Sequence, residues 1–260
     1  TDATLGAFTK YPKASIPIRP SSHVADKKFG FFQEQQHDFF EVAGNLGTLK
    51  NDNKILRHPL AYLVEAADDI CYTLIDFEDG INLGWISEDY ALEYLINLVR
   101  DRIDSKKYKI LSTKKDRLSY LRALSINTLI LEVAEIFMNN ELEILSGKFK
   151  ESLIKKSKYK AQMEDIINLS ILKIYQAPEV IDKELKGYQV INRLLDVFVG
   201  ATIRNSKNLA TAFDNLSLSC LPKNLINYDS DNTYKILLNV SSFIASLTDG
   251  KALEWYKKMS

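Results

Sequence analysis

Long stretches with apolar residues at helical spacing dominate this chain, and the residues that interrupt helices are scarce. The 260 residues include only 10 Gly and 6 Pro, and the apolar–polar alternation typical of strands is nearly absent. Hydrophobic residues make up 46% of the sequence, which is enough for a sizeable core. The sequence therefore predicts an all-α fold, with a single helical domain over residues 1–260.

The first 35 residues are the exception to this pattern. They contain Pro12, Pro17 and Pro20, so we expect an irregular, extended segment over residues 1–35 that packs on the helical body. Within it, residues 5–8 look like the end of a helix, and the chain opens without a Met. We therefore expect a piece of a longer polypeptide whose upstream part is missing from this sequence.

Helix start and stop signals divide the rest into about nine helices and a short closing one. Pro59 suits a first helical position, Thr113 is a helix cap, and Gly47 and Gly80 are expected just after helix ends. The expected helices cover residues 33–46, 59–79, 88–102, 113–139, 141–149, 158–175, 180–199, 206–216, 233–247 and 252–258.

Charge and composition exclude some classes of partner. The 34 basic residues balance 34 acidic ones, so no global attraction to nucleic acid or to an anionic membrane is expected. No run of about 18 apolar residues and no signal peptide are visible, so we expect a cytoplasmic protein without a membrane partner. Cys71 and Cys220 lie in apolar helical patterns, which favours buried thiols over a disulfide.

The stretch from Glu65 to Asp79 carries the strongest chemical signal. Asp68, Tyr72 and Asp76 are four residues apart, so on a helix they share one face with a drift of about 40° per step. Acids at core-facing positions usually build a site, because unpaired buried carboxylates are costly. The same acids would be solvated if the apolar face of an amphipathic helix ran through Leu60, Leu63, Val64, Ala67, Cys71 and Leu74.

Residues 57–72, RHPLAYLVEAADDICY, closely resemble an element of the deoxyguanosine triphosphate triphosphohydrolase family, which are metal-dependent, all-helical phosphohydrolases of the HD superfamily. The resemblance continues through residues 76–80, and the match over residues 65–79 is specific. Individually weaker matches lie in the same order as in the family, over residues 5–12, 28–32, 84–87, 187–195 and 242–256. The resemblance implies an HD-domain-type multi-helix phosphohydrolase of which this chain is the larger C-terminal portion.

The resemblance assigns roles along the helix that starts at Pro59. It makes Asp68 a ligand of the divalent metal (Mg, Mn or similar), packs Tyr72 on the deoxyribose and lets Asp76 accept a hydrogen bond from the sugar 3′-hydroxyl. These residue types suit those tasks, because hard cations prefer oxygen ligands and a carboxylate binds a hydroxyl strongly. Asp69 is expected to form salt bridges or to support the metal ligands.

The implied reaction is hydrolysis of a dGTP-like deoxynucleoside triphosphate to the deoxynucleoside and tripolyphosphate, by an enzyme that is usually a homo-oligomer. Lys28 and Lys10 are the candidates for triphosphate contacts, because a point charge on a flexible stem suits a phosphate tail. The alternative is that both lysines are simply solvated, like most lysines of the chain.

The family's His and His-Asp metal ligands and its His/Glu pair are missing from this chain. Its three histidines are His23, His37 and His58, and the His37-Asp38 dipeptide lies downstream of the Lys28 segment and lacks the family's following residues. We therefore expect no metal ligand there and assign no catalytic residue. The isolated chain is expected to be inactive, with an upstream segment supplying the missing groups.

Other interpretations stay open. A basic run that includes Phe149 and Tyr159 is best explained as a solvated helix junction, and a patch for single-stranded nucleic acid is the alternative; its lysines are Lys148, Lys150, Lys155, Lys156, Lys158 and Lys160. The protein could also be a non-catalytic helical module that binds nucleotide or nucleic acid, or an HD phosphohydrolase that acts on another phosphate ester.

Overall fold

The structure, a computed structural model, describes residues 1–15, 28–222 and 232–259; His23 lies outside them. Within these residues, helices account for nearly all regular structure, and the only β-pairs are isolated bridges, Ala14 with Phe31 and Leu49 with Ile55. The prediction of an all-α fold is confirmed. Among the described helices, none combines the length and the apolarity that a membrane crossing requires.

The described residues group into two compact units, Thr1–Ala177 (unit 1) and Pro178–Ser260 (unit 2). Each unit has a hydrophobic core of its own. The prediction of one helical domain over residues 1–260 stays a prediction.

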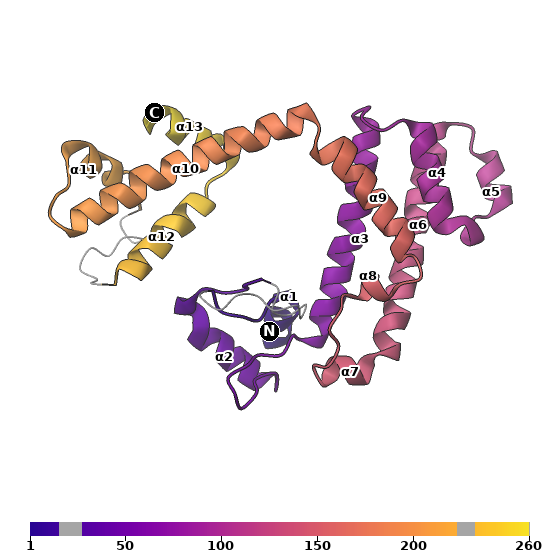
Figure 1. The fold of residues 1–260 in the computed structure, drawn as a ribbon, viewed down its shortest axis with the longest axis horizontal. Coiled ribbons are helices and arrows are strands. Elements are labelled where there is room, and N and C mark those ends of the chain that lie inside the picture. The colour runs from indigo at the N-terminus through magenta and orange to yellow at the C-terminus, as the bar shows by residue number, and fades with distance from the viewer. Residues whose placement is uncertain (16–27, 223–231, 260) are drawn as a thin grey trace. The chain divides into compact units, whose positions relative to one another are not determined.

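Unit 1 contains nine α-helices among its described residues, all labelled in Figure 1. They are α1 (Asp2–Phe8), α2 (Gln36–Asn45), α3 (Pro59–Asn82), α4 (Glu88–Val99), α5 (Ser105–Ile110), α6 (Lys114–Asn139), α7 (Glu141–Leu145), α8 (Leu153–Lys156) and α9 (Lys160–Ser170). Short 3-10 turns cover Gln33–Gln35 and Arg100–Arg102, and α9 continues into a π-helical turn, Ile171–Tyr175. The segment 1–35 is thus not wholly irregular, because α1 occupies part of it.

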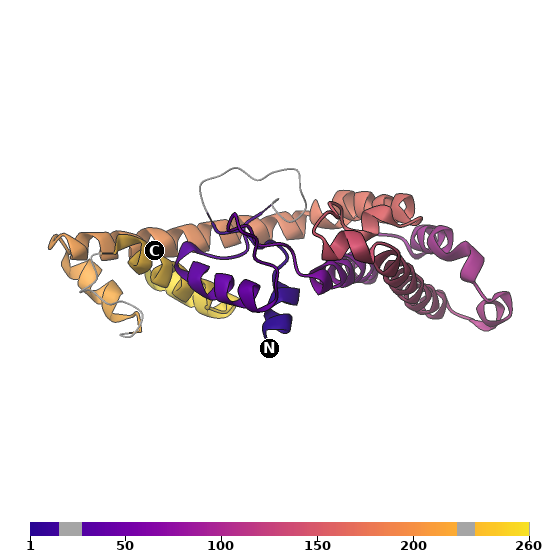
Figure 2. The same cartoon turned by 90° about the horizontal axis from the view of Figure 1, so that it is seen from below.

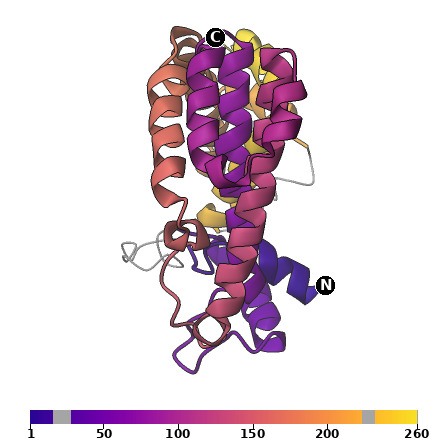
Figure 3. The ribbon, with the colours of Figure 1, turned by 90° about the vertical axis from the view of Figure 1, so that its right-hand side faces the viewer.

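Four helices of unit 1 build its core. α6 packs against α3 and α4, and α9 packs against the same two helices; Figure 3 shows the helices running alongside each other. Their buried side chains include Tyr62, Phe77, Leu98, Leu121 and Ile166. Because burying one large apolar side chain contributes about 1.5–3 kcal/mol, this cluster strongly stabilises the packing of the long helices.

Helix α3 begins where the sequence predicted and ends later. Pro59 occupies the first turn, and the backbone N–H of Leu60 donates to the His58 ring at 3.3 Å. Gly80 was expected to follow the helix end, but it lies inside α3. A Cβ at Gly80 would approach the Ile174 side chain to 2.5 Å, so this glycine permits close packing, and the left-handed residue after the helix is Gly84.

Other boundaries differ where short helices give weak signals. α6 runs from Lys114 as predicted, with the N–H of Asp116 donating to the Thr113 hydroxyl at 3.0 Å. The short helices α5 and α8 were not predicted. The helix expected over 206–216 is instead α11 (Ala212–Ser219), because α10 (Pro178–Ser206) extends to Ser206.

Unit 2 is built on α10. Helices α11, α12 (Thr233–Ala245) and α13 (Asp249–Met259) pack along it, as Figure 2 shows. Its core centres on Phe198, whose ring meets the edges of Phe243 and Trp255 at centroid distances of 5.9 Å.

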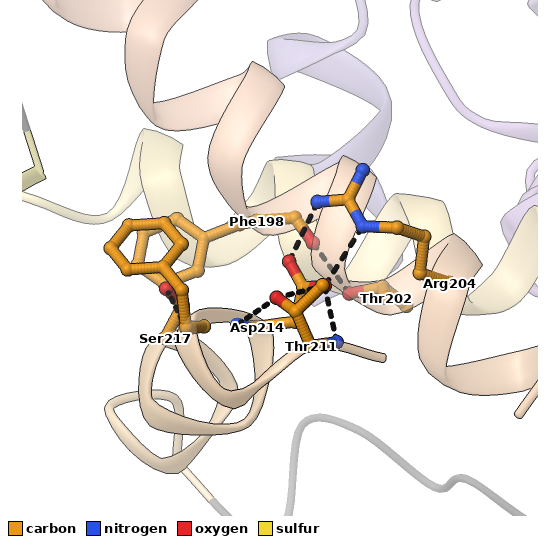
Figure 4. Close-up of polar contacts among 7 residues, drawn as sticks. Phe198, Thr202, Arg204, Thr211, Asp214 and Ser217 are labelled. Carbon is orange, nitrogen blue, oxygen red and sulfur yellow. Dashed lines mark hydrogen bonds and ion pairs between the residues drawn. The ribbon is translucent and has the colours of Figure 1, made fainter. Parts of the chain in front are cut away.

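A buried carboxylate links α10 to α11 (Figure 4). Arg204 donates two hydrogen bonds to Asp214, at 2.8 and 2.6 Å, and the N–H and hydroxyl of Thr211 donate two more at 2.8 Å. The N–H of Asp214 donates back to the Thr211 hydroxyl, which completes a capping box. The Arg204 guanidinium and the Thr211 donors hold the pKa of Asp214 well below its usual range. Asp214 is therefore held between α10 and α11 by an ion pair as well as by hydrogen bonds, and we call this arrangement the Asp214 clamp.

Candidate functional site

The face of α3 that carries the predicted site residues is turned away from the core. Asp68 is exposed, Tyr72 is 58% exposed and Asp76 is half-buried. The three residues share a face as predicted, but their interpretation as core-facing is wrong. The buried face instead runs through Ala61, Tyr62, Ala66, Ile70, Thr73, Leu74, Phe77 and Ile81.

The apolar face expected for this helix is also displaced. Leu60 and Val64 are more than 40% exposed, and Ala67 and Cys71 are exposed too. Cys71 and Cys220 are free thiols, but both are exposed, so the expectation of buried thiols is wrong. The error has a physical cause, because apolar residues occur on both sides of α3 and periodicity alone does not say which side meets the neighbouring helices.

A cavity of about 320 Å³ lies between α3, α8, α9 and the π-helical turn. Its walls are mostly apolar, with a few charged and phenolic groups. The lining residues that can bind a polar ligand are Asp69, Tyr72, Lys155, Lys160, Glu164 and Tyr175. This combination is typical of a small-molecule site, and every lining residue lies in unit 1.

Two tyrosines and one acid form a connected group at this cavity. The Tyr175 hydroxyl donates to Asp76 Oδ2 at 2.8 Å, and the rings of Tyr72 and Tyr175 lie 5.9 Å apart with a 31° tilt. Burial, and then the contacts with Tyr72 and Asp76, raise the pKa of Tyr175, so this phenol stays protonated and can donate. Tyr175 was not among the predicted site residues. It lies in a π-helical turn, a feature of the structure that often marks functional sites.

Asp69, not Asp68, lines the cavity. Burial raises the pKa of the Asp69 carboxyl, while the nearby Lys10 lowers it and Glu65 raises it. Asp68, by contrast, is exposed to solvent. Asp69 therefore has a more direct place in the pocket than the supporting role expected for it.

The two predicted phosphate lysines lie in different surroundings. Lys10 Nζ is 3.4 Å from Glu65 Oε1 on α3, and it is close enough to Asp69 to influence that carboxyl. Lys28 is exposed, with its Nζ 6.0 Å from the centre of the Tyr11 ring. Lys10 Nζ lies 5.8 Å from the centre of the same ring, so Tyr11 is close to both lysines, and of the two Lys10 also has an ion-pair partner on α3.

A tight backbone contact joins the two segments that carry these lysines. The N–H of Gly30 donates to the carbonyl of Lys13 at 3.0 Å, and that of Ser15 donates to Phe31 at 2.8 Å. A Cβ at Gly30 would lie 1.8 Å from the Tyr11 carbonyl oxygen, so only glycine fits. The resemblance segments 5–12 and 28–32 are therefore neighbours in space.

A buried ion pair lies behind Lys10. Arg57 Nη1 is 2.7 Å from Glu65 Oε2, and the guanidinium lies over the Tyr62 ring at 4.5 Å. Within the described residues, Arg57 Nε and Nη2 have no hydrogen-bond acceptor. This pair was not predicted, because a spacing of eight residues between a loop position and a helix position does not indicate a contact.

The described residues do not complete a metal site on their own. No group of three or more His, Cys, Asp and Glu side chains that could hold a cation occurs among them. His37 and Asp38 are strongly exposed and face each other at 3.7 Å. His58 caps α3, and burial lowers its pKa. A metal-ligand role for Asp68 stays a prediction.

Several lysines of the basic run have local partners. Lys158 pairs with Glu132 at 2.9 Å, and Lys156 donates to the Asn140 side chain at 2.9 Å. Lys155 and Lys160 line the cavity, and Lys160 also lies 3.8 Å from Glu164. The helix-junction interpretation accounts for the paired lysines, and a nucleic-acid patch stays a prediction.

No family model matches the chain. A deoxyguanosinetriphosphate triphosphohydrolase-like protein from Synechocystis is 34% identical over 100% of this chain and 59% of its own length. A protein of the same description from Listeria monocytogenes is 29% identical, covering 100% of the chain and 60% of its own length. A deoxyguanosinetriphosphate triphosphohydrolase from Yersinia pestis is 28% identical over 76% and 42%. The chain spans about 60% of the first two relatives. These matches confirm the resemblance seen in the motifs: the chain is similar over its whole length to proteins of the deoxyguanosinetriphosphate triphosphohydrolase family.

Proposed function

We propose that this chain forms the nucleoside-binding part of an enzyme that hydrolyses deoxynucleoside triphosphates to deoxynucleoside and tripolyphosphate. The names of its relatives support a dGTP-like substrate. The observation that carries the proposal is the group of Tyr72, Tyr175 and Asp76 at a mostly apolar cavity.

The tyrosine pair suits a deoxyribose. Two rings 5.9 Å apart offer flat apolar surfaces that can pack on a sugar and crowd a 2′-hydroxyl. The Tyr175 hydroxyl donates a hydrogen bond to Asp76 Oδ2, whereas Asp76 Oδ1 accepts no hydrogen bond within the described part of the chain. That oxygen can accept the 3′-hydroxyl, and the Tyr175 bond keeps the carboxylate turned toward the sugar.

Three lysines at or near the cavity are candidates for contacts with a phosphate tail. Lys10 approaches α3 near Asp69, and Lys155 and Lys160 line the cavity. Lysine ammonium groups can neutralise the charge that builds on the departing tripolyphosphate. We assign Lys10 the closest contact, because it reaches Glu65 on α3, and Lys28 an outer one, because its side chain is exposed.

A divalent cation such as Mg²⁺ or Mn²⁺, when bound, would polarise the α-phosphate and orient the attacking water. Such cations take about six oxygen ligands, which the described residues do not supply together. We assign Asp68 as one ligand and infer that the other ligands and the acid/base groups lie in protein beyond these 260 residues. Exposed Leu60, Val64 and Ile75 on α3 support a covering partner segment. The isolated chain is then inactive.

The sugar assignment is tested by substituting Asp76. We expect Asp76→Asn to weaken dGTP binding about tenfold and to leave tripolyphosphate binding unchanged, because only the sugar contact is altered. Titration calorimetry of the chain with dGTP, dideoxy-GTP and tripolyphosphate measures this. Equal losses for dGTP and dideoxy-GTP would show that Asp76 does not bind the 3′-hydroxyl. Exposed Asp79→Asn on the same helix is the matched control.

The reaction is tested by joining this chain to the remaining segment of a family member. Release of tripolyphosphate supports the proposal. Release of pyrophosphate or phosphate would identify a different phosphohydrolase, and binding without turnover would identify a non-catalytic nucleotide-binding module.

A further inference from the structure

Glu65 divides its two carboxylate oxygens between a buried cation and a partly exposed one. Oε2 lies 2.7 Å from Arg57 Nη1, and Oε1 lies 3.4 Å from Lys10 Nζ. The Arg57 side chain is 1% exposed, whereas that of Lys10 is 32% exposed. Glu65 is therefore fixed on one side, and on its other side it holds an ammonium that a solute can reach.

Arg57 is the fixed side of this arrangement. Its guanidinium packs on the Tyr62 ring, and the Tyr62 hydroxyl donates to the Phe149 carbonyl at 2.9 Å. A guanidinium this deeply buried requires a carboxylate nearby, because an unpaired buried charge is strongly unfavourable. Arg57 therefore holds Glu65 in place, and Glu65 keeps one oxygen directed at Lys10.

We propose that Glu65 is a positioning residue for Lys10, holding its ammonium near Asp69 until a phosphate tail takes the place of Glu65 as its ionic partner. The proposal rests on the phosphate role of Lys10 in the proposed function. A lysine free in solvent loses side-chain entropy when it binds a ligand, and a lysine already held near the ligand loses less. The gain would appear as affinity for the tail.

A simpler role for Glu65 predicts the opposite sign. If Glu65 only neutralised its two cations, its removal would leave two positive charges and strengthen the attraction for an anion. If Glu65 positions Lys10, its removal weakens anion binding, despite the added positive charge. The sign of the change in affinity therefore separates the two roles.

The experiment measures binding of inorganic tripolyphosphate to the 260-residue chain by titration calorimetry at low ionic strength. We expect Lys10→Met to weaken binding by about tenfold or more, as for a lost charge-assisted bond, and Glu65→Gln to weaken it by about threefold to tenfold. The double variant should bind no more weakly than Lys10→Met, since Glu65 acts through Lys10. Lys13→Met, which removes the same charge three residues away, is the matched control.

A second variant removes the Glu65 carboxylate without leaving a buried cation. Replacing both members of a buried ion pair with apolar residues is often tolerated, so Arg57→Met with Glu65→Leu provides a folded protein that lacks the carboxylate. It should reproduce the loss seen for Glu65→Gln. Circular dichroism and thermal melting confirm that each variant is folded before its affinity is compared.

The outcomes separate this inference from the function on which it rests. Tighter binding by Glu65→Gln, or a loss in the double variant equal to the sum of the single losses, would overturn the positioning role alone. Unchanged affinity in Lys10→Met, or no tripolyphosphate binding by the unsubstituted chain, would overturn the phosphate role of Lys10 itself.

Discussion

Each unit of this chain contains a buried carboxylate paired with an arginine, and the two pairs differ in where the arginine lies. In unit 2, the Arg204 side chain is 47% exposed, and both oxygens of Asp214 accept hydrogen bonds. In unit 1, Arg57 is as buried as its partner Glu65 and leaves donors unmet within the described residues. Water can therefore solvate the Arg204 guanidinium, whereas it does not reach that of Arg57.

The difference distinguishes a structural clamp from a group beside a ligand pocket. The Asp214 clamp is complete, because it caps α11 and fixes α11 to α10 with no oxygen to spare. Glu65 shares its charge with a third residue, Lys10, that solvent reaches. Unsatisfied or shared charges concentrate at functional sites, where stability is exchanged for binding, so the incomplete pair is the informative one.

The largest expected effect is on the stability of unit 1. Glu65→Ala leaves Arg57 buried without a carboxylate, which we expect to lower the free energy of unfolding by about 3–5 kcal/mol. Denaturant unfolding of a Trp255→Phe background follows Trp85, the one tryptophan then remaining, which reports on unit 1. Asp214→Ala in unit 2 should cost less, because the partly exposed Arg204 can be solvated when its partner is removed. A smaller loss of stability for Glu65→Ala than for Asp214→Ala would contradict the comparison.

The second effect concerns the pH dependence of unit 2. The lowered pKa of Asp214 means that its ionised form stabilises the fold at neutral pH and that this stabilisation is lost as the pH falls below the ordinary value of 3.8. Asp214→Asn should therefore destabilise unit 2 at pH 7 and flatten its stability between about pH 5 and pH 2. Trp255 fluorescence in a Trp85→Phe background measures this. An equally steep acid transition in the variant would assign it to other carboxylates.

The smallest effect compares one helical glycine in each unit. Gly80→Ala in α3 places a Cβ 2.5 Å from the Ile174 side chain, so overpacking of about 1–3 kcal/mol opposes the gain in helix propensity of about 1 kcal/mol. Gly187→Ala in α10 meets no atom within 4 Å and should gain stability. Unfolding midpoints of the two variants should move in opposite directions, and a gain at both positions would show that Ile174 adapts freely.

The sequence predicted the long helices well and the site only in part. Thr113 and Pro59 are strong local start signals, so α6 and α3 begin as expected. Local signals do not encode which side of α3 is buried, because that depends on the helices packed against it, chiefly α1, α6 and α9. Tyr175 escaped prediction for the same reason: its bond to Asp76 joins residues 99 positions apart. Recognition of the family came from residue order, which periodicity does not contain.

The exposed thiols of this chain provide a footprinting assay that needs no engineering. Cys71 lies three residues from Asp68 on the open side of α3, whereas Cys220 follows α11 in unit 2. A protein segment that covers the Asp68 side of α3 should slow the alkylation of Cys71. The alkylation rate of Cys220 in the same molecule serves as the internal reference. Mass spectrometry of the two peptides would then show when that side is covered.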